Sequence, residues 1–315
     1  MSEDLEVGNF RYDLAEINQK IKNEIHENLL CINEKSRNYI KDIVSLINYE
    51  IGINKILSII LFGSQRKHSC EHTGISDCDL LFIFKDRVSN RHIREIEKYF
   101  IALEIKHKFR DYEDGIIQKI LNVIQQTTGM FVSHFLTKRK YWEEAKFHKI
   151  FRVNKFFSYI FAPRKIVLCS VIDNSNILYG EDLRNIVKSK VKIPVFDMLK
   201  STVMNLCISI FSLVISPLKK LKPMKYCLEA VKWALRASNY YAFEDTVELE
   251  KITRRFQQLE KYKMNRRHAK IFYKRFLDLR NQPRLDLGFM LRTPLRILKI
   301  HVKGFIYAKL VGKRK

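Results

Sequence analysis

The sequence predicts an α+β fold in which a mixed β-sheet with flanking helices is followed by an α-helical bundle. Two short apolar runs, at 56–62 and 80–84, are typical of strands that are buried on both faces. From residue 195 onward strand alternation is almost absent, and apolar residues recur at helical spacing. A chain of 315 residues is long enough for two domains, and these patterns place them at 1–194 and 195–315.

The first predicted domain opens with two helices over residues 12–52, because apolar side chains there recur at steps of three and four. Ser89 is the expected N-cap of a later helix. The patterns predict the following elements in chain order: strands at 55–62 and 78–84, helices at 90–108 and 112–127, a strand at 130–136, a helix at 138–150 and a short strand at 166–171.

The second predicted domain is helical throughout. Its segment 201–218 is uncharged, but a membrane-spanning helix needs about 20 apolar residues. Asn205, Ser209, Ser212 and Ser216 follow one another at steps of 4, 3 and 4, which makes one stripe of small polar side chains. We interpret this segment as a bundle helix packed on most of its sides, and a membrane role is not expected. Further helices are predicted at 224–241, 246–263, 265–281 and 292–310.

The positive charge of the chain is concentrated in its C-terminal part. The net charge is +24, and residues 196–315 hold 27 Lys and Arg against 9 Asp and Glu, a balance of +18. Such a field attracts polyanions, so nucleic acid is one candidate partner of the C-terminal domain. In 265–281 the basic residues alternate with Phe272, Tyr273 and Phe276. These aromatics either stack on bases or simply form the buried side of an amphipathic helix.

The six cysteines are dispersed and show no Cys-x-x-Cys spacing. The acidic start of the chain, Met1 to Val7, has no signal-peptide pattern. Both observations favour reduced thiols in a cytoplasmic protein.

The segment 55–85 carries the clearest chemical pattern. An apolar run ends at Gly63-Ser64, a loop follows, and Asp77-Cys78-Asp79 leads into the second apolar run. Alternate side chains of a strand share a face, so Asp77 and Asp79 project together and Cys78 points the other way.

Two such carboxylates can hold a pair of metal ions that clamp the attacking and leaving oxygens of a phosphoryl transfer. Gly63 lets the backbone approach a ligand closely, and Ser64 and the amides after it can donate to phosphate oxygens. Arg66 and Lys67, early in the loop, are candidate cations for a triphosphate, or else they lie on a solvated loop.

Leu61-Phe62-Gly63-Ser64 followed by Asp77-Cys78-Asp79-Leu80 resembles the signature of the DNA polymerase beta-like nucleotidyltransferase superfamily. The resemblance covers roughly residues 50–85 and continues more weakly at 128–131 and 177–183. It implies a nucleotidyltransferase-type sheet, with Gly63 and Ser64 holding a nucleoside triphosphate. It also implies that Asp77 and Asp79 hold Mg²⁺ or Mn²⁺.

The sequence departs from that family at a third carboxylate, which many members carry on a later strand. The matching strand at 130–136 contains no acid, and Ser133 or His134 occupies the expected place. A neutral imidazole can act as a base or as a metal ligand, so His134 is a candidate for either role. The alternative is a strand histidine that is hydrogen-bonded to backbone.

The expected reaction is attack by an acceptor hydroxyl on the α-phosphate of a nucleoside triphosphate, with release of pyrophosphate. The acceptor is RNA, a protein or a small molecule, which the sequence does not distinguish. Because the third acid is missing, the alternative is a non-catalytic protein of the same fold that binds nucleotide or RNA, as a regulatory or antitoxin-like partner does.

Overall fold

The computed structural model describes residues 25, 27–29, 32–63, 78–109, 132–191, 193–218, 221–260 and 263–311. The chain divides into two compact units, each described here by itself. One, the sheet unit, comprises Met1–Tyr112, Val132–Glu144 and Ser175–Leu183. The other, the helical unit, comprises Glu113–Phe131, Ala145–Asn174 and Arg184–Lys315.

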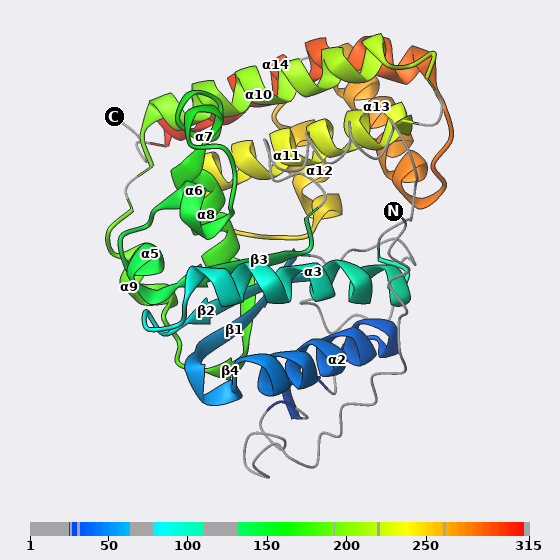
Figure 1. Ribbon diagram of the computed structural model, residues 1–315. Helices are drawn as coiled ribbons and strands as arrows, with labels where there is room; N and C mark the ends of the chain where they lie inside the picture. Colours follow the sequence, from blue (N-terminus) through cyan, green and yellow to red (C-terminus); the bar gives the residue numbers. More distant parts are fainter. Residues whose placement is uncertain are drawn as a thin grey trace. The chain divides into compact units, whose positions relative to one another are not determined.

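The described part of the sheet unit contains a four-stranded mixed sheet in the order β3-β2-β1-β4 (Figure 1). Strand β1 is antiparallel to both of its neighbours, whereas β2 and β3 are parallel. The strands are β1 Ile56–Phe62, β2 Asp79–Phe84, β3 His134–Lys138 and β4 Ser175–Gly180. All of β1 is buried, as a run of apolar residues at both parities predicts. The predicted class, a mixed sheet with helices followed by a helical region, is therefore confirmed.

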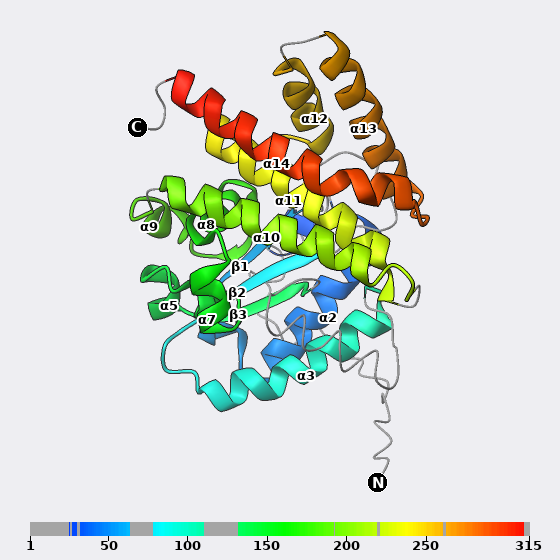
Figure 2. The same ribbon diagram turned by 90° about the horizontal axis from the view of Figure 1, so that it is seen from above.

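Helices α2 (Glu34–Glu50) and α3 (Asn90–Lys106) cover one face of this sheet (Figures 1 and 2). Each begins at a polar cap: Asn33 accepts from the Ser36 amide, and Ser89 accepts from the His92 amide, as predicted for Ser89. A short 3₁₀ turn, η2 (Ile53–Lys55), leads from α2 into β1.

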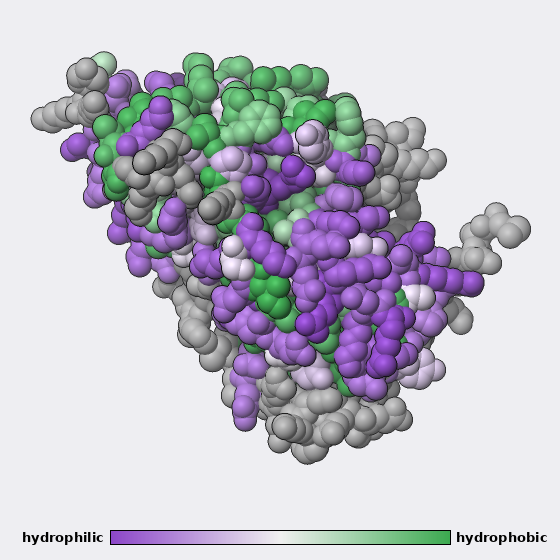
Figure 3. All heavy atoms as spheres, turned by 90° about the vertical axis from the view of Figure 1, so that its left-hand side faces the viewer, coloured by the Kyte–Doolittle hydropathy of each residue, from purple (hydrophilic) through white to green (hydrophobic). Residues whose placement is uncertain are grey.

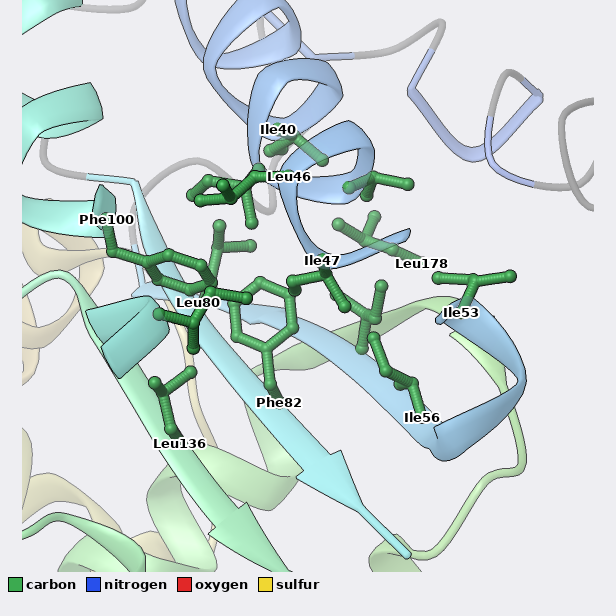
Figure 4. Close-up of a cluster of buried hydrophobic side chains, with 14 of the residues drawn as sticks. Ile40, Leu46, Ile47, Ile53, Ile56, Leu80, Phe82, Phe100, Leu136 and Leu178 are labelled. Carbon is green, nitrogen blue, oxygen red and sulfur yellow. The ribbon is translucent and has the colours of Figure 1, made fainter. Parts of the chain in front are cut away.

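The core of the sheet unit lies between these helices and the strands (Figure 4). Leu80 and Phe82 of β2 and Leu136 of β3 point into it and meet Phe100 of α3. This contact fixes which face of each strand is turned toward the helices, and so it also fixes the direction of the side chains between them.

The predicted helix over 138–150 is two short helices, α5 (Arg139–Glu143) and α6 (Phe147–Ile150). The chain turns at Ala145, whose φ of +50° takes it out of the right-handed helical region. The predicted helix over 112–127, and almost all of the helix predicted before α2, lie outside the described residues.

The predicted strand at 166–171 is wrong, because this segment forms helix α8 (Arg164–Asp173). The Asp197 carboxylate accepts from the amides of Lys165 and Ile166, which satisfies the first turn of the helix. Ile166 and Cys169 pack at helical spacing into a buried cluster of the helical unit. A contact from 31 residues away thus decides the conformation of an apolar run that local pattern leaves ambiguous.

The helical unit is built around α11 (Pro223–Phe243), which is buried along most of its length. Helices α10 (Val195–Val214) and α14 (Leu287–Leu310) pack on α11 and on each other (Figures 1 and 2). Besides α6 and α8, the described part of this unit also contains α7 Lys155–Ile160, α9 Arg184–Lys188, α12 Leu249–Gln258 and α13 Lys263–Asn281.

The helical unit begins earlier than the predicted domain boundary between residues 194 and 195. Residues 145–174 belong to it, because α8 packs against α10 and α11. The Tyr240 hydroxyl of α11 donates to the Asp173 carboxylate at 2.6 Å and holds the end of α8 in place.

The aromatic residues of α13 face the core of the helical unit. Phe272, Tyr273 and Phe276 are buried, whereas Arg267 and Lys270 of the same helix are exposed. Ordinary amphipathicity, one of the two interpretations of 265–281, is therefore confirmed. These three rings are not available to stack on bases.

A buried hydrogen-bonded chain joins α10 to α14. His301 Nδ1 lies 3.0 Å from the Ile297 carbonyl, and Nε2 lies 3.1 Å from the Ser201 hydroxyl. The Asn205 amide in turn donates to Ser201 Oγ. A neutral ring that donates through Nδ1 and accepts through Nε2 satisfies every one of these contacts. Burial lowers the pKa of His301 to about 4, from its usual value of 6.5.

We expect the helical unit to lose stability as the pH falls from 6.5 toward 4. In that window the unfolded chain binds a proton at His301 and the folded chain does not, so acid favours unfolding. Between pH 7 and pH 5 the loss amounts to about 2 kcal/mol. Urea unfolding followed by circular dichroism at the two pH values measures it. His301→Gln removes the titrating group, and an unchanged pH dependence in that variant would contradict this assignment.

Candidate active site

The ends of β1 and β2 bring the two halves of the sequence motif together. Phe62, the last residue of β1, pairs with Asp79, the first residue of β2. Gly63 follows with a φ of +81°, a backbone conformation that residues other than glycine rarely adopt. A Cβ built on Gly63 would lie 2.2 Å from Asp79 Oδ2. The glycine backbone therefore lies directly against the carboxylate, and any larger residue would have to displace it.

Asp79 points to the face of the sheet opposite to α2 and α3. Its neighbours Cys78 and Leu80 are fully buried in the core on the helix-covered face, so alternation turns Asp79 the other way. Phe62 and Phe135 lie on the same face as Asp79, and their ring centroids are 5.9 Å apart. Cys78 is fully buried in the core, whereas Asp79 is partly exposed at the start of β2, as the expected alternation requires.

The structure does not bring His134 together with Asp79. His134 pairs with Leu80 and shares its face, where the ring contacts Phe100 at 5.1 Å between centroids. Its Nδ1 lies 2.7 Å from Oε1 of Glu104, and both side chains are buried. This placement corrects the expected role of His134 as a base or metal ligand beside the paired acids, because the sheet separates the imidazole from Asp79.

Ser133 is the residue that lies on the face of Asp79 at this end of β3. Its carbonyl accepts from the Leu80 amide at 2.8 Å, which continues the pairing of β2 with β3 by one residue. Strand alternation then places its side chain with Phe135 and not with His134. The place where a third carboxylate would be expected is therefore held by a hydroxyl.

Glu104 is a buried acid that the sequence did not single out. It continues the series Ile93, Ile96 and Phe100 at helical spacing on the inner side of α3. An acid in that series is the signal that was available, because the position predicts burial and buried acids need a partner. His134 is that partner.

Tyr39 of α2 is buried, and the electrostatic field of Glu104, Cys78 and Asp79 acts on its phenol. Burial, with the negative charges of Glu104, Cys78 and Asp79 adding to it, raises the pKa of the Tyr39 phenol well above its usual range. The phenol is therefore neutral at neutral pH.

Several predicted site residues lie outside the described residues: Ser64, Arg66, Lys67 and Asp77. Within the described part of the chain, no group of three or more His, Cys, Asp or Glu side chains is placed to share a metal ion. That finding does not extend to the predicted pair, because only Asp79 of the two acids is described.

Gly63→Ala is expected to lower nucleotide transfer by roughly tenfold to a hundredfold, because the new methyl group displaces the Asp79 carboxylate. The thermal midpoint should fall only slightly, since the carboxylate is a side chain that can move aside and the positive φ costs about 1–2 kcal/mol. Gly288→Ala is the matched control, because a Cβ there meets an atom at an ordinary 3.5 Å. Full transfer by the Gly63 variant would show that the close contact has no role in activity.

No family model matches this sequence, and no curated protein matches it. Among solved structures, the chain is similar to spectinomycin adenyltransferase AAD(9) from Enterococcus faecialis, determined with ATP and spectinomycin. The identity is 11% and the TM-score 0.45, over 86% of this chain and 98% of that chain. At that identity and TM-score the similarity carries no information about activity, so any function has to be supported by the residues themselves.

Proposed function

We propose that this chain is a metal-dependent nucleotidyltransferase that moves a nucleoside monophosphate from a nucleoside triphosphate to an acceptor hydroxyl. The observation that supports this most directly is the contact between the Gly63 backbone and the Asp79 carboxylate. A glycine and an acid that are 16 residues apart in sequence meet at one edge of the sheet. That is the arrangement on which the resemblance of 50–85 to the DNA polymerase beta-like superfamily depends.

The metal of this proposal is Mg²⁺ or Mn²⁺. Asp79 offers carboxylate oxygens, which are the ligands that hard cations prefer, and it stands partly exposed at the strand end. Asp77 and Asp79 would hold the metal, which when bound supplies positive charge to the phosphoryl oxygens and the attacking hydroxyl.

The remaining roles follow from the motif. Gly63 and Ser64 would hold the β- and γ-phosphates through backbone amides and the hydroxyl, with Arg66 and Lys67 as neighbouring cations. The acceptor oxygen forms a bond to the α-phosphorus, the bond from that phosphorus to the bridging oxygen breaks, and pyrophosphate leaves. The acceptor hydroxyl loses its proton to solvent water in this reaction. We assign His134 no part in it, since its ring lies with Phe100 and Glu104 on the other face of the sheet.

A second function is favoured by Ser133. A hydroxyl where a third carboxylate would be expected leaves the site with fewer acids for metal and proton transfer. On this alternative the chain binds a nucleotide without turning it over and acts as a regulatory protein. We place either activity in the cytoplasm, in agreement with the free cysteines Cys78, Cys169, Cys207 and Cys227.

The experiment that separates the two functions uses the purified full chain. It is incubated with each α-labelled nucleoside triphosphate, with Mg²⁺ or Mn²⁺, and with an extract that supplies candidate acceptors. Label that moves to a metabolite or macromolecule, together with pyrophosphate release, supports the transferase and identifies the base and the acceptor class. Nucleotide binding by equilibrium dialysis without any transfer supports the regulatory alternative. If the chain neither binds nor transfers a nucleotide, both functions are contradicted.

A further inference from the structure

The outward sides of α10 and α14 form a continuous apolar surface, which we name the α10/α14 face. On α14 the exposed residues follow one another at steps of four and three along the whole helix: Leu287, Leu291, Leu295, Leu298, Val302 and Ile306. On α10 the corresponding exposed residues are Phe196, Leu199, Val203, Ile210 and Val214. Figure 3 shows hydrophobic side chains gathered along the edge that α10 and α14 form in Figure 1.

Helix α10 has its polarity reversed compared with an ordinary surface helix. Its buried side carries Ser201, Asn205, Ser209 and Ser212, whereas Val214 on the outer side is 71% exposed. A surface helix of a water-soluble protein normally buries its apolar stripe and exposes its polar side. The predicted inward direction of the small polar stripe is confirmed, and one apolar side of α10 is left exposed to solvent.

The contacts that hold the three helices together use small residues. A Cβ on Gly304 of α14 would lie 2.9 Å from the Cβ of Ser238 of α11, so the two backbones approach closely. Ser201 meets His301 at the contact between α10 and α14. Small residues at the helix contacts with leucines turned outward are typical of helices that pack in an apolar environment.

The exposed charged residues of α14 are all basic. The helix has no Asp or Glu and five Lys and Arg, of which Arg296 and Lys303 pair with the buried Glu260. Arg292, Lys299 and Lys309 are exposed on α14 beside the apolar stripe. Two copies of this face would bring cations against cations, whereas an anionic surface would pair with them.

Aromatic residues lie around Lys200, near the N-terminus of α10. Phe156 and Tyr159 of α7 are largely exposed, and Lys200 Nζ stands 5.2 Å from the centroid of the Tyr159 ring and 5.0 Å from that of Phe196. Aromatic and basic side chains that occur together are typical of the boundary between water and lipid.

We propose that the α10/α14 face docks on the surface of a membrane that contains anionic lipids. The leucines enter the boundary between head groups and acyl chains, and the flanking cations pair with lipid phosphates. Helix α10 is long and apolar enough to cross a membrane by length and composition alone. Its inner side nevertheless packs on α11 and α14, and 44% of its apolar stretch is buried, so we place α10 on the membrane surface and not across the membrane.

The test measures co-sedimentation of the full chain with vesicles of phosphatidylglycerol and phosphatidylcholine, or of phosphatidylcholine alone. We expect binding to the anionic vesicles that weakens at high salt. The variant Val214→Glu/Leu295→Glu should bind them at least tenfold more weakly. Both positions are exposed, at 71% and 68%, so the substitutions should leave the fold intact, and circular dichroism checks this. Met264→Glu/Ile271→Glu on exposed positions of α13 makes the same charge change and should bind within twofold of the unaltered chain.

Three results would overturn the proposal. The first is no sedimentation of the unaltered chain with anionic vesicles. The second is equal loss in both double variants, which would mean that charge alone and not the face decides binding. The third is a dimer in sedimentation velocity that the Val214/Leu295 variant dissolves, without vesicle binding, which would assign the face to a second copy of the chain.

Discussion

Asp79→Asn is expected to lower nucleotide transfer roughly a thousandfold while leaving the fold unchanged. Asparagine keeps the size of the side chain but removes the negative charge that would hold the metal ion, and charge stabilisation by such an ion is worth several kcal/mol. Each 1.36 kcal/mol corresponds to a tenfold change in rate. The carboxylate is partly exposed at the end of β2, so its replacement leaves no buried cavity. Transfer of label from an α-labelled nucleoside triphosphate measures the loss.

Asp278→Asn is the control for this substitution. Asp278 is an exposed acid of α13, and the same loss of charge there should leave transfer within twofold of the unaltered chain. If Asp79→Asn retained full transfer, the proposed site would be wrong, whatever activity the chain has. If the unaltered chain binds nucleotide without transferring it, and Asp79→Asn loses that binding, the regulatory alternative would be supported. Asp79 would then belong to its nucleotide-binding site.

The central part of the sheet unit could be predicted from the sequence because its signals are local. The apolar runs that end at Gly63 and begin after Asp79 are strands within one residue of their predicted ends. Alternation alone placed Cys78 in the core and turned Asp79 the other way. Ser89 caps α3 as expected, because a capping bond depends only on residues three positions apart.

The face of His134 could not be predicted, because it depends on the pairing of two strands. The predicted strand at 130–136 is observed as β3 at 134–138, and its register is set by the pairing of His134 with Leu80. A shift of one residue in register moves every side chain to the other face. The imidazole of His134 then lies within hydrogen-bond distance of the Glu104 carboxylate, 30 residues earlier in the sequence.

Strand β4 illustrates the same limit. The apolar run at 166–171 resembles a strand as well as the segment at 175–180 does, and pattern alone does not choose between them. Asp197 caps the first run and makes it helical, whereas the second pairs with β1. Both decisions come from residues far away in the sequence, so they belong to the folded chain and not to the local pattern.

Gly180→Ala is expected to destabilise the sheet unit by about 3–5 kcal/mol, because it combines a strained backbone with a backbone collision. Gly180 has a φ of +83°, and a Cβ there would lie 2.1 Å from the carbonyl oxygen of Leu57 in β1. The same carbonyl accepts from the Glu181 amide at 2.8 Å, so moving it aside also breaks this link between the strands. Unlike the Asp79 side chain beside Gly63, a backbone carbonyl in the middle of a sheet has no free rotation by which to move.

Urea unfolding followed by the fluorescence of Trp142 measures this loss in a Trp233→Phe background. Trp142 is fully buried, and its indole donates to the carbonyl of Leu183 at 2.9 Å, so it reports on the sheet unit. Gly288→Ala in the same background is expected to be neutral or slightly stabilising, because its Cβ meets only an ordinary contact and its φ is not positive. Equal midpoints for the two alanine variants would show that β4 separates from β1 at no cost. The antiparallel pairing of β1 with β4 would then contribute little to the fold that positions Gly63 and Asp79.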